Sequence, residues 1–282
     1  MSGTLQLPRP TWFVGSGNMG GAILEGWRTG GLDLSPVTVI RPSGKPVDGC
    51  RVVTSFAAAG APPRFVVLGF KPQKLHEIAP ELRQFLSAGT VVVSLLAGIE
   101  AASLRQRFPG VASIVRAMPN LPVAIRRGVT GLYSADANKP TEDELNNLFS
   151  ALGFAIWMSD EAKLAALGSV AGAGPAYVAR FIAALSKAGQ KRGLSEEIAA
   201  VIARETVLGT AWMAATTGED MESVARRVAS PKGTTEAGLA VLDRDHVLDE
   251  LIAVTIEAAG RRGTELAEEA KDSSLAEATR PS

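Results

Sequence analysis

Apolar and polar residues alternate in two different ways along this chain, and the change comes near residue 159. Up to Ser159, short β-branched runs alternate with stretches of helical spacing. This alternation predicts a mostly parallel sheet with helices on both faces. The expected strands are Thr11–Val14, Val37–Ile40, Phe65–Phe70, Thr90–Leu96, Ser113–Arg116, Gly128–Tyr133 and Phe154–Met158. The expected helices are Leu75–Leu86, Ala101–Phe108 and Thr141–Leu152.

The last of these helices carries a start signal of its own. It opens with T-E-D-E, in which Thr141 can act as the N-cap and Glu144 can reach back to it. This pairing is a capping box. We therefore expect the helix to begin at Thr141.

After Ser159 the strand signals stop and Ala-rich helical stretches follow. They are Glu161–Gly168, Ala176–Arg192, Glu196–Thr216, Met221–Val228, Glu236–Leu242 and Val247–Lys271. Ser195 is a good N-cap, and the acidic residues Glu196 and Glu197 suit the first turn of a helix. We expect a domain 1–159 with the sheet and an all-α domain 160–282.

Two of these helices have wide apolar faces. One carries Tyr177, Val178, Phe181, Ile182 and Leu185, and the other Ile198, Val201, Ile202 and Leu208. The core of an ordinary helical bundle accounts for such faces. A subunit interface is the alternative.

Composition narrows the classes of protein. The 282 residues carry a formal net charge of zero, which gives no reason to expect a nucleic-acid or membrane-surface partner. Cys50 is the single cysteine, so no disulfide can form within the chain. We find no signal-peptide pattern and no run near the roughly 18 apolar residues of a membrane helix. We expect a cytoplasmic protein.

A glycine-rich turn follows the first expected strand. The strand Thr11–Val14 leads into G-S-G-N-M-G and then a helical pattern, the context of a dinucleotide-binding site. Gly15 permits the tight turn, Gly17 the approach of a pyrophosphate, and Gly20 the packing of helix on sheet. The other residues of the turn are expected beside the same cofactor: Ser16, Asn18 and Met19. The fold class is therefore α/β with an N-terminal Rossmann-type NAD(P)-binding domain.

The residues after the second strand indicate which cofactor. NAD sites usually place an acid there for the ribose 2′-hydroxyl, but this chain has Arg41, Ser43 and Lys45. A 2′-phosphate suits these groups, and a charge-assisted hydrogen bond contributes about 1.5–3 kcal/mol. We predict NADPH, with NADH as the alternative. Arg41 and Lys45 as solvated surface charges would be the simpler interpretation.

Six motifs in order carry a family resemblance. They are GSGNMG at 15–20, GFKPQ at 69–73, SLLAGI at 94–99, RAMPNLP at 116–122, VAGAGPAY at 170–177 and SPKGTTEAGLAVL at 230–242. This set resembles the Δ1-pyrroline-5-carboxylate reductases over nearly the whole chain. The resemblance implies reduction of pyrroline-5-carboxylate to L-proline with NAD(P)H. It also implies a C-terminal domain that forms an intertwined homodimer, with larger rings of dimers in some members.

The resemblance also implies site residues. The substrate carboxylate is expected on a loop at a helix start formed by Ser230, Gly233, Thr234 and Thr235, where backbone N–H groups and hydroxyls can hold an anion. Thr235 is the candidate catalytic residue beside the imine nitrogen. It either donates the proton or orients an imine that is already protonated. Helix capping by the threonines is compatible with both roles.

Further contacts are implied at the ends of the strands. The nicotinamide half of the cofactor is expected beside Phe70, Lys71, Pro72, Ala97 and Gly98. Asn120 is expected beside nicotinamide and substrate, with a turn-forming role as the alternative. Glu161 is expected near the substrate, with a solvated helix start as the alternative.

Four positions depart from the family pattern near the implied site. Ala173 replaces a serine, Lys232 a glycine, Leu121 a threonine, and Arg226 stands in V-A-R where relatives have L-K-D. If position 232 needs a positive φ, lysine there is strained. These changes leave room for a shifted substrate.

Two other functions stay open. One is a different NADPH-dependent imine, 2-keto or β-hydroxyacid reductase of the same fold. The other is a regulatory protein that binds NADPH without turnover. Metal chemistry has little support because His76 and His246 lie on separate helical segments without a cluster of ligands.

Overall fold

The computed structural model describes residues 5–278, with side chains as far as residue 269. The chain forms two compact units. Unit 1 runs to Ala173 and resumes at Ala259, and unit 2 is Gly174–Ala258.

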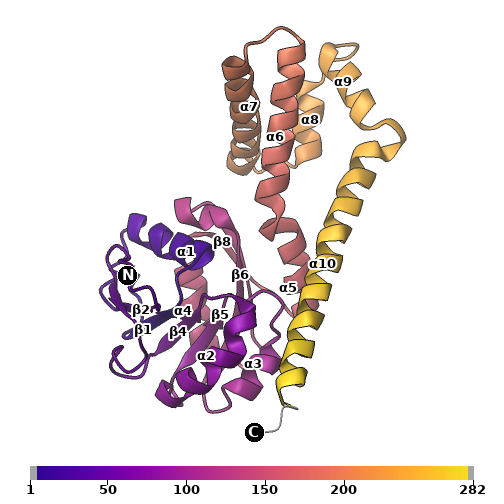
Figure 1. Cartoon of the computed structure of the whole chain (residues 1–282). Coiled ribbons are helices and arrows are strands. Elements are labelled where there is room, and N and C mark those ends of the chain that lie inside the picture. Colours follow the sequence, from indigo (N-terminus) through magenta and orange to yellow (C-terminus); the bar gives the residue numbers. More distant parts are fainter. Residues whose placement is uncertain (1–4, 279–282) are drawn as a thin grey trace. The chain divides into compact units, whose positions relative to one another are not determined.

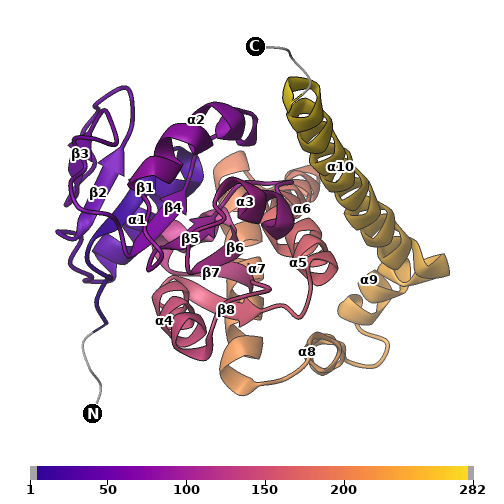
Figure 2. The same ribbon diagram turned by 90° about the horizontal axis from the view of Figure 1, so that it is seen from below.

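Unit 1 is built on one sheet of eight strands. These are β1 (Thr11–Val14), β2 (Val37–Ile40), β3 (Arg51–Val53), β4 (Phe65–Leu68), β5 (Val91–Ser94), β6 (Ser113–Pro119), β7 (Gly128–Tyr133) and β8 (Gly153–Trp157). The order across the sheet is β3-β2-β1-β4-β5-β6-β7-β8 (Figure 2). All neighbouring pairs are parallel except β6–β7. The predicted sheet is confirmed.

Helices cover both faces of this sheet (Figure 1). Helices α1 (Asn18–Thr29) and α4 (Lys139–Ser150) pack on one face. Helices α2 (Leu75–Leu82) and α3 (Ala101–Arg107) pack on the other. Each central strand feeds both clusters in alternation: Phe13 lies in the first, Trp12 and Val14 in the second. The sequences of such strands are continuous apolar runs because both faces of each strand are buried.

One prediction about local structure was wrong, and one strand was missed. Helix α4 begins at Lys139, and its N-cap is Asn138, whose side chain accepts from the Thr141 N–H at 3.0 Å. Asn is a stronger N-cap than Thr, and Pro140 is tolerated in the first turn, where its missing N–H costs nothing. Strand β3 was not predicted, because its three residues are partly exposed and carry little pattern.

Unit 1 extends past the predicted domain boundary at Ser159. Helix α5 (Glu161–Leu167) packs on the sheet, since Leu164 is buried and lies against Gly131. A π-helix, η4 (Gly168–Gly172), follows it. The limits 1–159 and 160–282 stay a prediction about functional domains.

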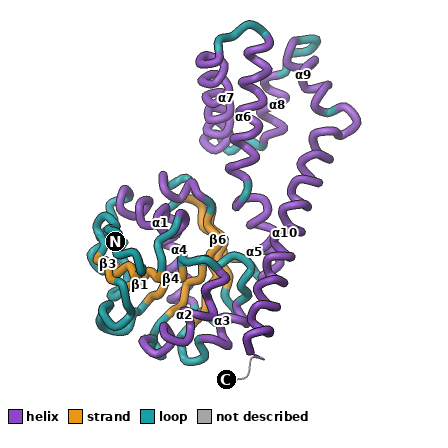
Figure 3. The backbone as a smooth tube through the Cα atoms, viewed as in Figure 1, coloured by secondary structure: helices purple, strands orange, loops and turns teal. Residues whose placement is uncertain are grey.

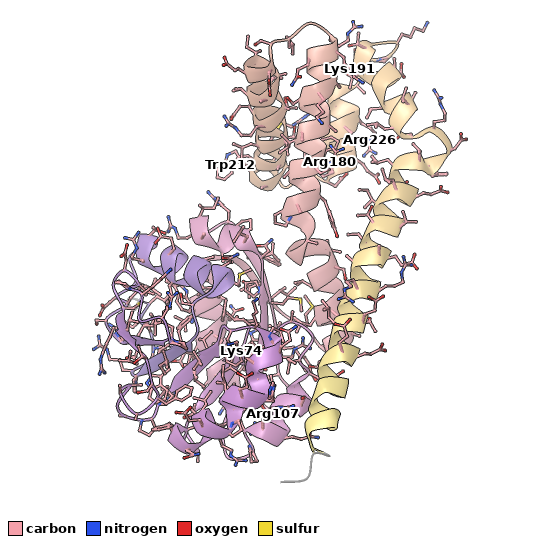
Figure 4. The ribbon with its side chains drawn as sticks, in the orientation of Figure 1. Lys74, Arg107, Arg180, Lys191, Trp212 and Arg226 are labelled. Atoms are coloured by element: carbon pink, nitrogen blue, oxygen red, sulfur yellow. The ribbon has the colours of Figure 1, made fainter. Side chains whose placement is uncertain are left out.

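Unit 2 is helical, without a described strand (Figure 3). It contains α6 (Gly174–Lys191), α7 (Glu196–Thr217), α8 (Met221–Val228), α9 (Thr234–Leu242) and the first part of α10 (Val247–Ala278). Ser195 is the N-cap of α7, as predicted, and accepts from the Ile198 N–H. Most of its large apolar side chains are exposed, including Trp212 on α7 (Figure 4).

We expected no segment long and apolar enough to span a membrane, but helix α7 meets both criteria. Within the described residues it alone is long and apolar enough to cross a membrane, with 17% of its most apolar window buried. Length and composition are weak evidence for a span, because the apolar faces of a helical interface meet the same criterion.

Candidate active site

The glycine turn after β1 lies where the chain reverses its direction across the sheet. From β1 the chain builds β2 and β3 on one side, and β4 begins the other side. Ligands of such sheets bind outside the carboxyl ends of the strands at this switch point. Gly15 has φ +80°, and a Cβ there would lie 2.9 Å from the Gly69 carbonyl oxygen. The two turns therefore meet through backbone, which requires glycine at position 15.

Helix α1 opens from this turn without a side-chain cap. Gly17 is its N-cap residue, and no side chain accepts from the first turn. The N–H groups of that turn are therefore suited to a phosphate. Ser16, Asn18 and Met19 flank these N–H groups in sequence.

The packing expected at Gly20 does not require glycine there, and α1 makes a much closer approach, to the Val123 backbone, at Gly26. A Cβ on Gly20 would lie 3.6 Å from the nearest neighbour, the Gly15 carbonyl oxygen, which is ordinary contact. A Cβ on Gly26 would lie 2.2 Å from the Val123 carbonyl oxygen. The close approach of α1 thus requires glycine at position 26. The signal was available as a glycine inside an apolar helical pattern.

A cationic turn follows β2 at the same edge of the sheet. Arg41 Nε donates to Ser43 Oγ at 3.0 Å, and the Lys45 N–H donates to the same oxygen at 3.4 Å. The Arg41 N–H is held by the Val53 carbonyl of β3 at 2.9 Å. The unpredicted strand β3 therefore fixes the backbone of this turn. The side chains of Ser43 and Lys45 in the turn are exposed to solvent.

The turn after β4 carries the next predicted cofactor residues. Lys71 precedes a short 3₁₀ helix, η1 (Pro72–Lys74), and its carbonyl accepts from the Lys74 N–H at 2.9 Å. The half-buried ring of Phe70 packs against the core on the α2–α3 face. Lys71 is exposed. These residues lie at the carboxyl edge, as expected for cofactor contacts.

The turn after β5 has a second neighbour that the sequence did not reveal. Gly98 has φ +74°, and a Cβ there would lie 3.2 Å from backbone atoms of Ala267 in the part of α10 that belongs to unit 1. Ala97 is exposed. The missing side chain of Gly98 is thus explained by its φ and by α10. Contact of Ala97 and Gly98 with nicotinamide stays a prediction.

Asn120 is buried and uses both ends of its side chain. Its Oδ1 accepts from the Val129 N–H at 2.8 Å, and its Nδ2 donates to the Ala171 carbonyl of η4 at 3.0 Å. The side chain therefore joins the end of β6 to β7 and to the π-helix. The predicted contact with ligand remains a prediction, and the alternative structural role has direct support.

Glu161 has two partners within unit 1. Its Oε1 accepts from the Ala101 N–H at 2.8 Å and from Arg116 NH1 at 2.9 Å. Arg116 lies in β6, and its side chain is only 9% exposed. Sequence reasoning missed Arg116, although a charged residue inside the apolar run S-I-V-R-A-M is a signal for a buried partner. The predicted substrate contact of Glu161 stays untested.

The predicted substrate loop lies in unit 2 before α9. Gly233 is the N-cap residue, its N–H donates to the Ser230 carbonyl at 2.9 Å, and a Cβ on it would lie 2.4 Å from Ser230 Oγ. Thr234 and Thr235 occupy the first turn, and no side chain caps the helix. Thr235 is half-buried and Thr234 exposed. The loop thus offers uncapped first-turn N–H groups beside two hydroxyl-bearing residues, the groups that an anion site needs.

Two departures from the family pattern can be placed on this unit. Lys232 has φ +58°, so the strain expected of a lysine at this position is present. Its N–H donates to the Glu236 carboxylate at 2.6 Å. Arg226 on α8 pairs with Glu222 and Ser223 of its own helix.

Two family models match different parts of this chain. Residues 161–266 match the family described as pyrroline-5-carboxylate reductase dimerisation, and residues 12–98 match NADP oxidoreductase coenzyme F420-dependent. The pyrroline-5-carboxylate reductase of Pseudomonas aeruginosa is 35% identical over 91% of this chain and 96% of its own. Pyrroline-5-carboxylate reductase 2 of Bacillus subtilis is 31% identical, over 91% and 95%.

Solved structures give the same picture. A pyrroline-5-carboxylate reductase from Coxiella burnetii superposes with a TM-score of 0.85 at 30% identity, covering 93% of this chain and 99% of its own. A Plasmodium falciparum pyrroline carboxylate reductase with NADP bound has a TM-score of 0.81 at 22% identity, covering 94% and 100%, and shows the fold.

Proposed function

Because this chain belongs to the pyrroline-5-carboxylate reductase family, we propose that it reduces L-1-pyrroline-5-carboxylate to L-proline with NADPH. The observation that carries the proposal is the loop before α9. Its uncapped helix start and the hydroxyls of Ser230, Thr234 and Thr235 suit a small anionic imine. Similarity to curated reductases over nine-tenths of the chain supports the same reaction.

The chemistry requires a hydride at the imine carbon and a proton at the ring nitrogen. Bound NADPH supplies the hydride. The chain holds the carboxylate with the first-turn N–H groups of α9 and the hydroxyl of Thr234, which needs no cation. Thr235 places its hydroxyl at the ring nitrogen. A threonine hydroxyl is a weak acid, so its main work is to orient an imine that has been protonated in solution.

The cofactor is a nicotinamide dinucleotide, and the residues of this chain fit its phosphates. The space beside Gly17, where a Cβ would meet only the Gly69 carbonyl oxygen at 3.9 Å, and the uncapped N–H groups of α1 suit a pyrophosphate. Arg41 and Ser43 suit a 2′-phosphate. Arg41→Ala should lower the NADPH preference over NADH by about ten- to a hundredfold. An unchanged ratio of kcat/KM values would leave Arg41 as a solvated surface charge.

The protein forms a homodimer through unit 2. The dimerisation family match covers this unit, and its apolar faces on α6, α7 and α10 are exposed in the single chain. We propose that the functional domains are 1–159 and 160–282, and that the enzyme is cytoplasmic. Assembly of dimers into a larger ring is a further proposal.

Absorbance of NADPH tests the reaction directly. Purified protein should oxidise NADPH only when pyrroline-5-carboxylate is present, with proline as product. Thr235→Ala should lower kcat by about a hundredfold, while Thr235→Ser should retain most of it because the hydroxyl remains.

Two results would redirect this proposal. Turnover of another cyclic imine or of a 2-keto acid in place of pyrroline-5-carboxylate would make the chain a different reductase of the same fold. NADPH binding without turnover of any of these compounds would support a regulatory protein.

A further inference from the structure

We propose that Glu161 and Arg116 are positioning residues, which hold the turn between β5 and α3 in place for the nicotinamide end of the cofactor. This inference rests on the proposed function. It differs from the expectation that Glu161 contacts the substrate, because the structure gives the carboxylate two partners within its own unit.

One carboxylate oxygen joins three elements. Glu161 is the first residue of α5, Arg116 lies in β6, and Ala101 is the first residue of α3. Both donors reach the same atom, Oε1, at 2.8 and 2.9 Å. A single rotamer of Glu161 therefore fixes the start of α3 and the side chain of Arg116 together.

Helix α3 depends on this contact because it has no cap of its own. Glu100 is its N-cap residue in backbone conformation, but its side chain does not cap the helix. The Ala101 N–H is one of the donors that a helix start leaves without a partner in the helix. Glu161 accepts from it across 60 residues of sequence and also places a negative charge at the helix start.

Arg116 makes the arrangement sensitive to charge. Its side chain is 9% exposed, and the Glu161 carboxylate is the ion-pair partner found among the described residues. A buried guanidinium without its counter-ion is costly, so loss of Glu161 should move Arg116 and the strand end around it. Arg116 lies opposite Ser94, the last residue of β5, so such a movement reaches the β5 turn.

The turn itself is held from its other side by α10. A Cβ on Gly98 would lie 3.2 Å from the Ala267 backbone, so this part of the turn is in close contact with the helix. The turn leaves the carboxyl end of β5, two strands from β1, at the edge where the dinucleotide binds in this fold. Glu161 thus controls the end of the turn that α10 does not hold.

Four variants test the proposal on two readouts. Direct binding of NADPH, followed by its fluorescence, is measured apart from turnover, so that a failure of the proposed reaction does not hide a result. Glu161→Ala should weaken NADPH binding about tenfold, the equivalent of one charge-assisted hydrogen bond, and leave KM for the imine within about twofold. Glu161→Gln keeps an oxygen acceptor for the Ala101 N–H but removes the negative charge opposite Arg116, so its NADPH affinity should lie between those of the wild type and Glu161→Ala.

The matched control is a second Arg–Glu pair at the opposite edge of the same sheet. Arg64, just before β4, pairs with Glu144 of α4 at 3.0 Å. Glu144→Ala should leave NADPH binding unchanged. If Glu161→Ala fails to fold, the double variant Glu161→Ala/Arg116→Met removes the unpaired charge and carries the same prediction for NADPH.

Three outcomes would overturn the proposal. A rise in KM for the imine with unchanged NADPH binding would make Glu161 a substrate ligand. Unchanged values for both in Glu161→Ala would make the pair dispensable. Equal weakening of NADPH binding by Glu144→Ala would show a general loss of stability and no positioning.

Discussion

The two units bury their apolar residues to very different extents. In unit 1 both faces of the sheet are covered, and Trp12, Phe13 and Phe108 are fully buried. In unit 2 few of the described residues are buried, and those that are have small side chains, such as Ala199, Ala203 and Val224. Its large apolar side chains are exposed: Val178, Phe181, Leu185, Leu194, Ile198, Val201, Ile202, Leu208, Trp212, Met221, Val228, Val241, Leu242, Val247, Leu248, Leu251, Ile252 and Val254.

This difference in burial shows that the two units are stabilised by different contacts. Full burial of one large apolar side chain contributes about 1.5–3 kcal/mol. Unit 1 gains this stabilising free energy from contacts within the single chain. Unit 2 gains most of this stabilisation only when a second copy covers its exposed apolar faces, in agreement with the dimerisation match over this unit.

The largest expected effect comes from a charge on the exposed apolar face of unit 2. Phe181→Glu should place a carboxylate in the dimer interface at a cost of about 3–5 kcal/mol and dissociate the dimer. Ile125→Glu is the control, since Ile125 is an exposed apolar residue of unit 1. Analytical ultracentrifugation should show monomers for the first variant only. If both variants remained dimers, the exposed apolar face around Phe181 would not be the dimer interface.

A pair of substitutions on α1 tests how tightly unit 1 is packed. Gly26→Ala brings Cβ to 2.2 Å from the Val123 carbonyl oxygen and should destabilise the protein by about 1–3 kcal/mol. Gly21→Ala meets its nearest atom, Ser16 Oγ, at 3.9 Å and should stabilise by about 0.5–1 kcal/mol. Urea unfolding measures both. The same sign for the two would contradict the packing described for α1.

A single position in unit 2 carries strain that glycine would remove. Lys232 has φ +58°, and the left-handed conformation costs an ordinary residue about 1–2 kcal/mol. Lys232→Gly should therefore raise the free energy of unfolding by about 1 kcal/mol. Lys187→Gly, at an exposed position inside α6, should lower it. A loss of stability in Lys232→Gly would show that the lysine side chain contributes more than its backbone costs.

The smallest effect should be equal in the two units. Hydrogen bonds from the backbone N–H groups of Lys163 and Ser223 hold the pKa values of the helix-capping residues Asp160 (unit 1) and Asp220 (unit 2) below the usual 3.8. Because the folded pKa is lowered, this stabilisation is present above pH 3.8 and is lost as pH falls through the lowered value. Asp160→Asn and Asp220→Asn should lower Tm slightly near neutrality and not at the acidic limit. A difference that grows in acid would contradict this sign.

The sheet could be predicted because its strands are buried on both faces. Runs such as Thr11–Val14 and Val37–Ile40 were predicted with the bounds that the structure shows. The wrong helix start at Thr141 came from two competing caps, and Asn138 won because of its own side chain and Pro140. Strand β3 carried little pattern because it has only three residues and lies partly exposed at the end of the sheet.

The site was predictable only where a backbone conformation requires one residue type. Gly15 is such a residue. Arg116 and the true partners of Asn120 and Glu161 depend on contacts between distant segments, such as Glu161 with Ala101, which no local pattern encodes. The close approach of Gly26 to Val123 was missed for the same reason, since it depends on the path of a segment far along the chain.

The most direct test of the account is the mass of the protein in solution, measured by light scattering through a dilution series with activity followed in parallel. We expect a mass of two chains, or a multiple of two, with NADPH oxidation proportional to the amount of that assembly. A stable monomer with full activity would contradict it, because the exposed faces of unit 2 would then need no partner.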